Sequence, residues 1–319
     1  MTQNLKYTFG PVPSRRLGYS LGVDIIPMKT CNLNCVYCEL GRSTDETMTL
    51  KEYISADAIV EEVQQVIAST SRIDYITFSG SGEPTLNTAM GEMIHRIKAM
   101  TDIPVAVLTN GTLLYLPEVR EMLYAADLVI PSLDAVSKQV FKKVDRPHGH
   151  LDIDRIVEGI ITFSKEYSGP IWLEILFVKG INDTPEEVQL LIEAAKKIDA
   201  DLIQLNTIVR PPAENNVQPL SEAELNAIQK LFGDRAEVVA NFKASKSQAK
   251  EESHGDRIYD LIMRRPVTKN ELSATLNLTP ELVEEHVSKM LAAGKIAASD
   301  YTGELFYTSP RLKNRPVIT

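Results

Sequence analysis

Six short apolar runs alternate with helix-like stretches over the first two thirds of the chain, and this alternation constrains the fold most. The apolar runs cover residues 19–26, 73–78, 105–108, 128–130, 171–178 and 202–205. Stretches with helical periodicity or helix-start signals cover residues 56–69, 88–100, 117–124, 151–167, 184–198 and 221–232. Apolar strands that alternate with helices predict an α/β fold with a parallel sheet, whose strand-end turns converge on one mouth.

The pattern changes after this region. Residues 244–253 are polar and rich in Lys, Ser and Glu, which predicts a linker between two domains. Beyond it lie three short helical stretches and two strand-like stretches, at 256–263, 269–276, 279–293, 295–299 and 305–309. We therefore predict an α/β domain over residues 1–243 and a winged-helix-like domain with a basic tail over residues 254–319.

Composition excludes several classes of protein. The 319 residues include 34 Lys plus Arg against 43 Asp plus Glu, a net charge of −9 that argues against coating nucleic acid by bulk electrostatics. It leaves room for a local basic groove. The sequence has no apolar stretch long enough for a membrane span and no secretory signal, so we expect a cytoplasmic protein. Three Cys are too few for a disulfide scaffold.

All three cysteines lie together, as Cys31, Cys35 and Cys38, in a C-x3-C-x2-C spacing. Thiolates at such a spacing are ligands of soft metals and of iron–sulfur clusters. Three thiolates leave one iron of a [4Fe–4S] cluster open, as catalytic metal sites do. The alternatives are three buried core cysteines, or zinc completed by a distant His. The segment is a poor helix former after Pro27, and His95, the closest of the five His in sequence, is no partner at finger spacing.

Together with Tyr37, this spacing resembles the C-x3-C-x-aromatic-C signature of the radical S-adenosylmethionine (SAM) superfamily. The resemblance covers roughly residues 8–240 and implies a partial (β/α)6 barrel. It further implies one [4Fe–4S] cluster on the three cysteines, with the amino and carboxylate groups of SAM on the open iron. An electron donor such as flavodoxin or ferredoxin would drive cleavage of SAM to methionine and a 5′-deoxyadenosyl radical.

Polar and Gly-rich turns after the predicted strands are the candidates for holding SAM. The turn Ser79–Pro84 resembles the Gly-Gly-Glu-Pro motif of the family, which implies that Glu83 binds the SAM ammonium group. Short side chains elsewhere suit the carboxylate and the ribose hydroxyls. The cofactor-binding candidates are Tyr37, Gly80, Gly82, Glu83, Asn110, Ser132, Asp134 and Asn206. For each turn, a role in the fold alone is the alternative.

The segment Gly10–Gly18, together with Lys29, resembles radical SAM proteins near the tRNA wyosine-base synthases. Its Pro and Gly residues predict an irregular path beside the cysteine loop. The candidate substrate contacts are Arg15, Arg16, Lys29, His148 and Arg210. Surface ion pairs are the alternative for the arginines, with Glu214 as the partner of Arg210, and a solvated loop is the alternative for His148.

Two classes of function follow. The first is a radical SAM enzyme that acts on RNA or, alternatively, on a peptide or small molecule; the absence of any Cys outside Cys31–Cys38 excludes a second thiolate-bound cluster. The second is a cluster-containing regulator whose winged helix binds DNA. The third predicted helix of that domain carries Glu281, Glu284 and Glu285 against Lys289, which argues against contact with DNA phosphates.

Overall fold

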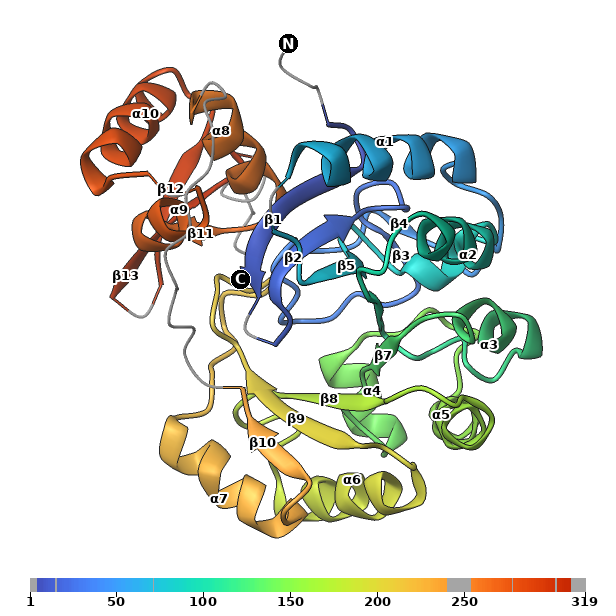
Figure 1. Cartoon of the computed structure of the whole chain (residues 1–319). Helices are drawn as coiled ribbons and strands as arrows, with labels where there is room; N and C mark the ends of the chain where they lie inside the picture. The colour runs from blue at the N-terminus through green and yellow to red at the C-terminus, as the bar shows by residue number, and fades with distance from the viewer. Residues whose placement is uncertain are drawn as a thin grey trace.

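The computed structural model describes residues 5–14, 16–70, 72–239, 254–276, 278–301 and 303–310. A curved sheet with helices on its outer side forms the larger part of the chain (Figure 1). One section has the strand order β1-β2-β5-β6-β7, with β1 Thr8–Ser14, β2 Gly18–Val23, β5 Tyr75–Phe78, β6 Val105–Thr109 and β7 Leu128–Pro131. The other has the order β10-β9-β8, with β8 Trp172–Phe177, β9 Leu202–Thr207 and β10 Ala236–Val238.

Two parallel bridges, Val129 to Ile171 and Ser132 to Glu174, connect β7 to β8 and join the two sections. The strands from β2 to β10 pair in parallel, and only β1 pairs antiparallel with β2. The six predicted strands are therefore confirmed as the parallel strands of an open partial barrel. The short strand β10 extends this sheet and was not predicted.

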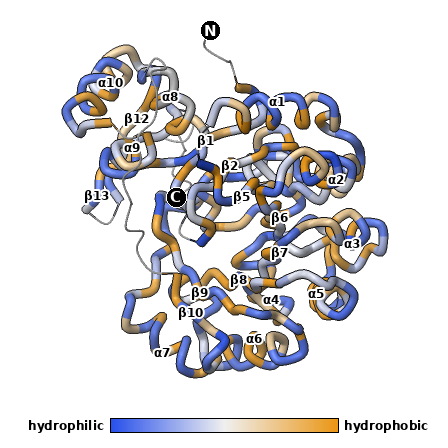
Figure 2. Tube along the Cα trace, viewed as in Figure 1, coloured by the Kyte–Doolittle hydropathy of each residue, from blue (hydrophilic) through white to orange (hydrophobic). Residues whose placement is uncertain are grey.

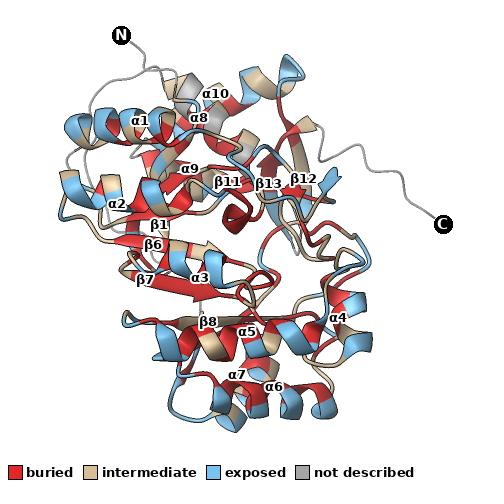
Figure 3. Cartoon of the chain, turned by 90° about the vertical axis from the view of Figure 1, so that its right-hand side faces the viewer, coloured by how far each residue is buried: buried red, intermediate tan, exposed pale blue. Residues whose placement is uncertain are grey.

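The outer layer consists of helices that bury one side against the sheet and expose the other (Figure 3). They are α1 Ala56–Ser69, α2 Met90–Met100, α3 Pro117–Leu123, α4 Lys138–Val144, α5 Ile153–Glu166, α6 Pro185–Lys197 and α7 Glu222–Phe232. Hydrophobic and hydrophilic residues both recur along these helices (Figure 2), as they do in amphipathic helices. The sequence predicted all of them except α4. A 3₁₀ turn, Pro84–Leu86, precedes α2, which begins at Met90 rather than at the predicted residue 88.

Strand β1 corrects the prediction of an irregular path through Gly10–Gly18. Residues Thr8–Ser14 are a strand, with a register shift between Phe9 and Val12. Prolines are tolerated here because β1 lies at the edge of the sheet, where an outward N–H is not needed for the ladder. The stretch is thus a strand despite its Pro and Gly content.

The two faces of the barrel wall differ in character. Val107, Val129 and Leu205 belong to the large core between the sheet and the outer helices. Because neighbouring side chains of a strand point to opposite faces, residues such as Ala106 and Ile130 line the concave face, where they form a separate apolar cluster. The concave face is therefore the inner surface of the barrel.

The C-terminal unit contains the predicted order of helices and hairpin. Its elements are α8 His254–Arg264, β11 Val267–Thr268, α9 Lys269–Leu276, α10 Pro280–Ala292, β12 Ala297–Tyr301 and β13 Glu304–Thr308. The strands form an antiparallel sheet of order β11-β13-β12. The unit lies beside β1 (Figure 1), and Val12 of β1 is part of its apolar core. The winged-helix assignment and the domain limits stay predictions, and the linker 244–253 and most of the basic tail lie outside the described residues.

Among the helices of the described residues, none is long and apolar enough to cross a membrane.

Candidate functional site

The three cysteines lie on the loop that follows β2. Cys31 is in the short strand β3, Thr30–Cys31, which pairs with β4, Asp45–Glu46. Cys35 and Cys38 follow in a turn, in which the amide of Cys38 donates to the carbonyl of Cys35 at 3.2 Å. All three are free thiols, and Cys31 and Cys35 pack against the large core. Their loop carries the candidate ligands.

The donor set of this loop is three thiols, which are ligands of iron–sulfur clusters. In the part of the chain that the structure describes, no three His, Cys, Asp or Glu side chains converge on one point where a metal ion would fit. A cubane cluster takes each thiolate on a different iron. The assignment of the three cysteines as its ligands, with one iron open, stays a prediction.

Two distant loops hold the cysteine loop by backbone hydrogen bonds. The amides of Asn34 and Val36 donate to the carbonyls of Asp145 and Val144, both at 2.9 Å, and the amide of His148 donates to the carbonyl of Asn32 at 2.9 Å. From the other side, an amide of the stretch after β9 donates to the carbonyl of Val36, also at 2.9 Å. Backbone hydrogen bonds of residues between and beside the cysteines therefore hold the loop.

The glycine turn after β5 packs directly on the cysteine loop. A Cβ added to Gly82 would lie 1.8 Å from the carbonyl oxygen of Thr30, which precedes Cys31. Gly80 has a φ of 149°, and a Cβ there would meet the carboxylate of Asp24 at 2.7 Å. The sequence predicted that these glycines allow a close backbone approach to SAM. The close approach in the structure is to other parts of the chain itself.

Glu83 is buried where this turn meets the end of β6. Its Oε1 accepts from the amide and hydroxyl of Thr85 at 3.0 and 2.5 Å and from the hydroxyl of Thr109 at 2.6 Å, while Oε2 accepts from the amide of Asn110 at 2.8 Å. Burial raises the pKa of Glu83, and these donors oppose the rise. Oε2 retains a lone pair, so its predicted role toward the SAM ammonium is compatible with these bonds.

Burial is also the main reason that the pKa of Cys31 is raised to about 12, and the negative charge of Glu83 adds to the rise. Asn110 lies against the same thiol, because its Nδ2 is 3.7 Å from Sγ of Cys31 and donates to Oδ1 of Asn32 at 2.7 Å. Glu83 and Asn110, both predicted as cofactor contacts, therefore lie next to the first cysteine.

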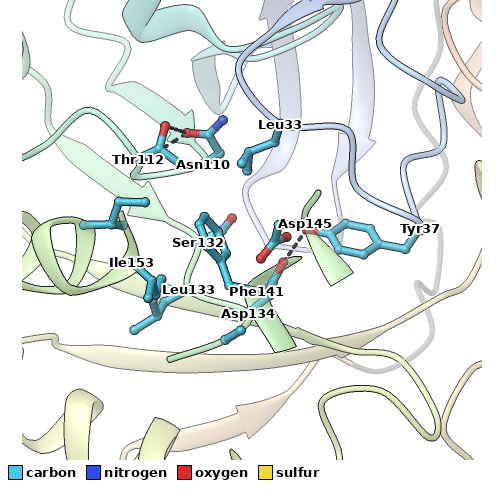
Figure 4. Close-up of a pocket in the computed structure, with 12 residues that line it drawn as sticks. Leu33, Tyr37, Asn110, Thr112, Ser132, Leu133, Asp134, Phe141, Asp145 and Ile153 are labelled. Carbon is cyan, nitrogen blue, oxygen red and sulfur yellow. Dashed lines mark hydrogen bonds between the residues drawn. The ribbon is translucent and has the colours of Figure 1, made fainter. Parts of the chain in front are cut away.

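Tyr37 and Asp134, two further predicted contacts, meet on the other side of the loop. The Tyr37 hydroxyl donates to Asp134 (Figure 4), whose other carboxylate oxygen accepts from the amide of Leu176 at 2.7 Å. Burial raises the pKa of Asp134 to about 7. Cys35 donates to Asp145 at 3.4 Å, and Asp145, also buried, has a pKa well above its usual range.

A pocket lies between these groups, lined among others by Tyr37, Asn110, Ser132, Asp134 and Asp145 (Figure 4). Four of these five residues were predicted as SAM contacts, so the structure brings them together. Asp145 was missed as a site residue. The only signal for it was its place at the start of a Pro- and Gly-containing loop after the fourth predicted strand.

Arg16 and Asn206 form a second group, on the concave face of β8 and β9. Arg16 pairs with Glu174 at 2.7 Å and donates to Gln204 at 3.3 Å, and Asn206 donates to Glu174 at 3.0 Å. All four side chains are largely buried. Sequence reasoning missed Glu174 and Gln204, although a polar residue inside an otherwise apolar strand is a usable signal.

The remaining substrate candidates are less closely connected with the pocket. Lys29 is partly exposed with a φ of 67°, and its backbone bonds to Ser81. The ring of His148 packs edge-on against His150, with centroids 5.1 Å apart. Arg15 lies outside the described residues.

Arg210, for which a substrate anion or Glu214 was considered, pairs instead with Glu39 and Glu271. Glu214 pairs with Arg42 and Arg146.

Sequence comparison identifies relatives across the whole chain. A UPF0026 protein of Helicobacter pylori is 37% identical over 310 residues, covering 96% of this chain and 98% of the relative. A protein named GTPase Obg from Brachyspira hyodysenteriae is 38% identical over 95% of this chain, but the chain spans only 45% of that relative. A probable GTP 3′,8-cyclase of Pyrococcus abyssi is 32% identical over 60% of this chain and 57% of its own length.

Solved structures share the fold at low identity. A radical SAM methyltransferase from Sphaerobacter thermophilus has a TM-score of 0.53 and 16% identity, over 69% of this chain and 65% of that one. TYW1 with a lysine–pyruvate adduct bound has a TM-score of 0.51 and 16% identity, over 70% of this chain and 75% of that one.

The family comparison confirms the prediction from the cysteine spacing and the expected cofactors. Residues 25–195 match the model of the radical SAM superfamily, and this match spans more than half of the chain. The chain belongs to the radical SAM superfamily, as an enzyme that uses one [4Fe–4S] cluster and S-adenosylmethionine.

Proposed function

We propose that this radical SAM enzyme removes a hydrogen atom from a nucleotide of RNA, in the cytoplasm, with Cys31, Cys35 and Cys38 as the cluster ligands. When bound and reduced by a donor such as flavodoxin or ferredoxin, the cluster supplies the electron that splits SAM into methionine and a 5′-deoxyadenosyl radical. The chain itself provides the ligands, the SAM contacts and the substrate wall. The subgroup near the tRNA wyosine-base synthases is part of this proposal.

The ligand loop and the turns around it support the first step. The cysteines must lose their protons to bind iron. Glu83, through Oε2, would accept from the SAM ammonium group. Ser132 lines the pocket next to Tyr37 and Asp134, where a hydroxyl could donate to the SAM carboxylate.

The concave face of the barrel supports the substrate class, and this observation carries the proposal. One part of it is apolar, with Leu128, Ile130 and the partly buried Trp172. The adjoining part on β8 and β9 is polar, with Glu174 and Arg16 at its centre. A nucleobase has apolar faces that stack on aromatic and apolar side chains and edges that carry donors and acceptors.

Glu174 can accept from base N–H groups, and Arg16 can donate to a carbonyl or ring nitrogen. The relative named as a probable GTP 3′,8-cyclase also supports a purine-containing substrate, because the substrate in its name is a purine nucleotide. RNA remains the first candidate because of the wyosine-like N-terminal segment.

The direct test compares modified nucleosides. RNA from a strain that lacks this chain, digested and analysed by mass spectrometry, should lack one modified nucleoside present in the parent strain. The reduced, cluster-loaded enzyme should then form 5′-deoxyadenosine faster with that RNA than without it. An unchanged nucleoside profile, together with stimulation by a peptide or a free nucleotide but not by RNA, would contradict the proposal in favour of that substrate.

Glu174→Gln should separate substrate turnover from SAM cleavage. The substitution removes the charge that pairs with Arg16, so we expect RNA-stimulated formation of 5′-deoxyadenosine to fall by roughly tenfold to a hundredfold. The slow cleavage of SAM without substrate should fall less than the RNA-stimulated reaction, because Glu174 does not itself line the pocket beside the cysteine loop. Glu166→Gln is the control for loss of an ion pair as such, since the more exposed Glu166 pairs with Arg120 away from the barrel interior.

The regulator alternative gains no support from the C-terminal unit. On α10, Glu285 pairs with Lys289, and Glu284 pairs with Lys269 of α9. These pairs neutralise lysines that a DNA-binding helix would direct at phosphates. The helix surface thus keeps the acidic character predicted from the sequence.

A further inference from the structure

Arg210 joins the cysteine loop to the C-terminal unit. Its Nη1 donates to both carboxylate oxygens of Glu39, at 3.1 and 3.3 Å, and its Nη2 donates to Oε1 of Glu271 at 2.7 Å. Glu39 directly follows Cys38, and Glu271 lies in the first turn of α9. The guanidinium group of Arg210, in the stretch after β9, therefore connects the residue next to a proposed cluster ligand with the C-terminal unit.

The guanidinium end of this contact is buried, while the two carboxylates are partly exposed. The side chain of Arg210 is only 9% exposed, and its Nε is buried without a hydrogen-bond partner among the described residues. A buried guanidinium is costly unless opposite charges compensate it, and loss of one partner leaves an uncompensated buried charge. Both carboxylates are thus needed to keep Arg210 in this position.

Glu271 is itself tightly held at the start of α9. Its Oε2 accepts from the amide of Thr268 at 3.0 Å, and its own amide donates to the Thr268 hydroxyl at 3.2 Å. This reciprocal arrangement is a capping box, which fixes the first turn of a helix. A displacement of α9 would therefore move the carboxylate that Arg210 binds.

The stretch that carries Arg210 contacts the cysteine loop at a second point. The amide of Glu214 donates to the carbonyl of Val36 at 2.9 Å, and its carboxylate pairs with Arg42 of the loop and with Arg146. We call residues 210–214 the strut, because this segment contacts the cysteine loop through Arg210 at one end and Glu214 at the other. The other side of the C-terminal unit is anchored on β1 through Val12.

We infer that Arg210 is a positioning residue through which the C-terminal unit holds the cysteine loop in place for cluster binding. If Arg210 no longer binds Glu39, the loop is held to the strut only through Glu214. The inference rests on the proposed ligation of the cluster by Cys38. It assigns the C-terminal unit a role in the reaction that does not require it to bind nucleic acid.

The test uses the full chain with Glu271→Gln and Arg210→Met, measured by hydrogen exchange before cluster loading. Glutamine can maintain the capping box, so Glu271→Gln removes the charge contact while α9 keeps its start. We expect amides of residues 36–42 to exchange at least roughly tenfold faster in both variants. Arg120→Met, which removes a buried guanidinium that pairs with the exposed Glu166 away from the loop, should leave these amides unchanged.

A spectroscopic readout then separates positioning from general destabilisation. In the loaded, reduced protein, the electron paramagnetic resonance signal of the cluster should change in Glu271→Gln and Arg210→Met but not in Arg120→Met. Unchanged loop exchange in both variants, or an equal effect of Arg120→Met, would overturn the inference. Because the exchange measurement needs no cluster, it remains decisive even if Cys38→Ala retains its cluster and the ligand assignment fails.

Discussion

Cys35→Ala should abolish the brown cluster absorbance after anaerobic reconstitution with iron and sulfide, and with it the cleavage of SAM. The loop has three thiols, and the chain has no other Cys that could replace the missing one. We expect formation of 5′-deoxyadenosine to fall by at least roughly a thousandfold, as is typical when a group required for the chemistry is removed. The product is measured by chromatography after reduction with SAM present.

Thr44→Ala is the matched control for Cys35→Ala. Thr44 lies on the same loop and is exposed, so its truncation should leave cluster content and SAM cleavage unchanged. Thermal unfolding of the cluster-free proteins should show that Cys35→Ala still folds, because the loop is held by backbone bonds from Val144, Asp145 and Glu214. Full cluster content in a folded Cys35→Ala protein would contradict the ligand assignment.

Gly82→Ala should have the second largest effect, through the backbone alone. The added Cβ would lie 1.8 Å from the carbonyl oxygen of Thr30, and backbone cannot move aside as a flexible side chain can. Relief of this overlap requires a shift of the turn or of the cysteine loop. We expect the free energy of unfolding to fall by about 1–3 kcal/mol, with at least roughly tenfold lower cluster occupancy.

Gly149→Ala provides the control for Gly82→Ala in a neighbouring loop. A Cβ at Gly149 has nothing within 4 Å and its backbone lies outside the left-handed region, so alanine should be neutral or slightly stabilising. The measurements are chemical denaturation of the cluster-free protein and iron content after reconstitution. Normal iron content in Gly82→Ala would show that the turn after β5 does not set the position of the cysteine loop.

The parallel strands were predictable because a sheet covered by helices needs continuous apolar runs, which are a local signal. Strand β1 was not, because its prolines and Gly10 suggest a loop unless the strand is known to lie at an edge. Helix α4 is short, and only Phe141 and Val144 are buried in it, so its periodicity is weak. Local pattern thus identified the long elements and missed those that depend on their place in the sheet.

The candidate site likewise has residues that the sequence could predict and contacts that it could not. The cysteines were predicted as ligands from their spacing alone, and the turns after β5, β6 and β7 were predicted as their neighbours because strand ends of a parallel sheet converge. The partners of individual side chains could not, since Asn110 and Cys31 are 79 positions apart and Arg210 and Glu39 are 171 apart. Glu174 escaped notice because its partner Arg16 comes from the β1–β2 turn, across the open side of the barrel.

Strand β1 is an edge that the C-terminal unit partly covers. Its outer edge is the end of the sheet, and such an edge can pair with a strand of another chain. Pro11 and Pro13 lack N–H groups, and the C-terminal unit covers Val12 beside them. Because the C-terminal unit packs on Val12, it shields this part of the edge from pairing with a strand of another chain.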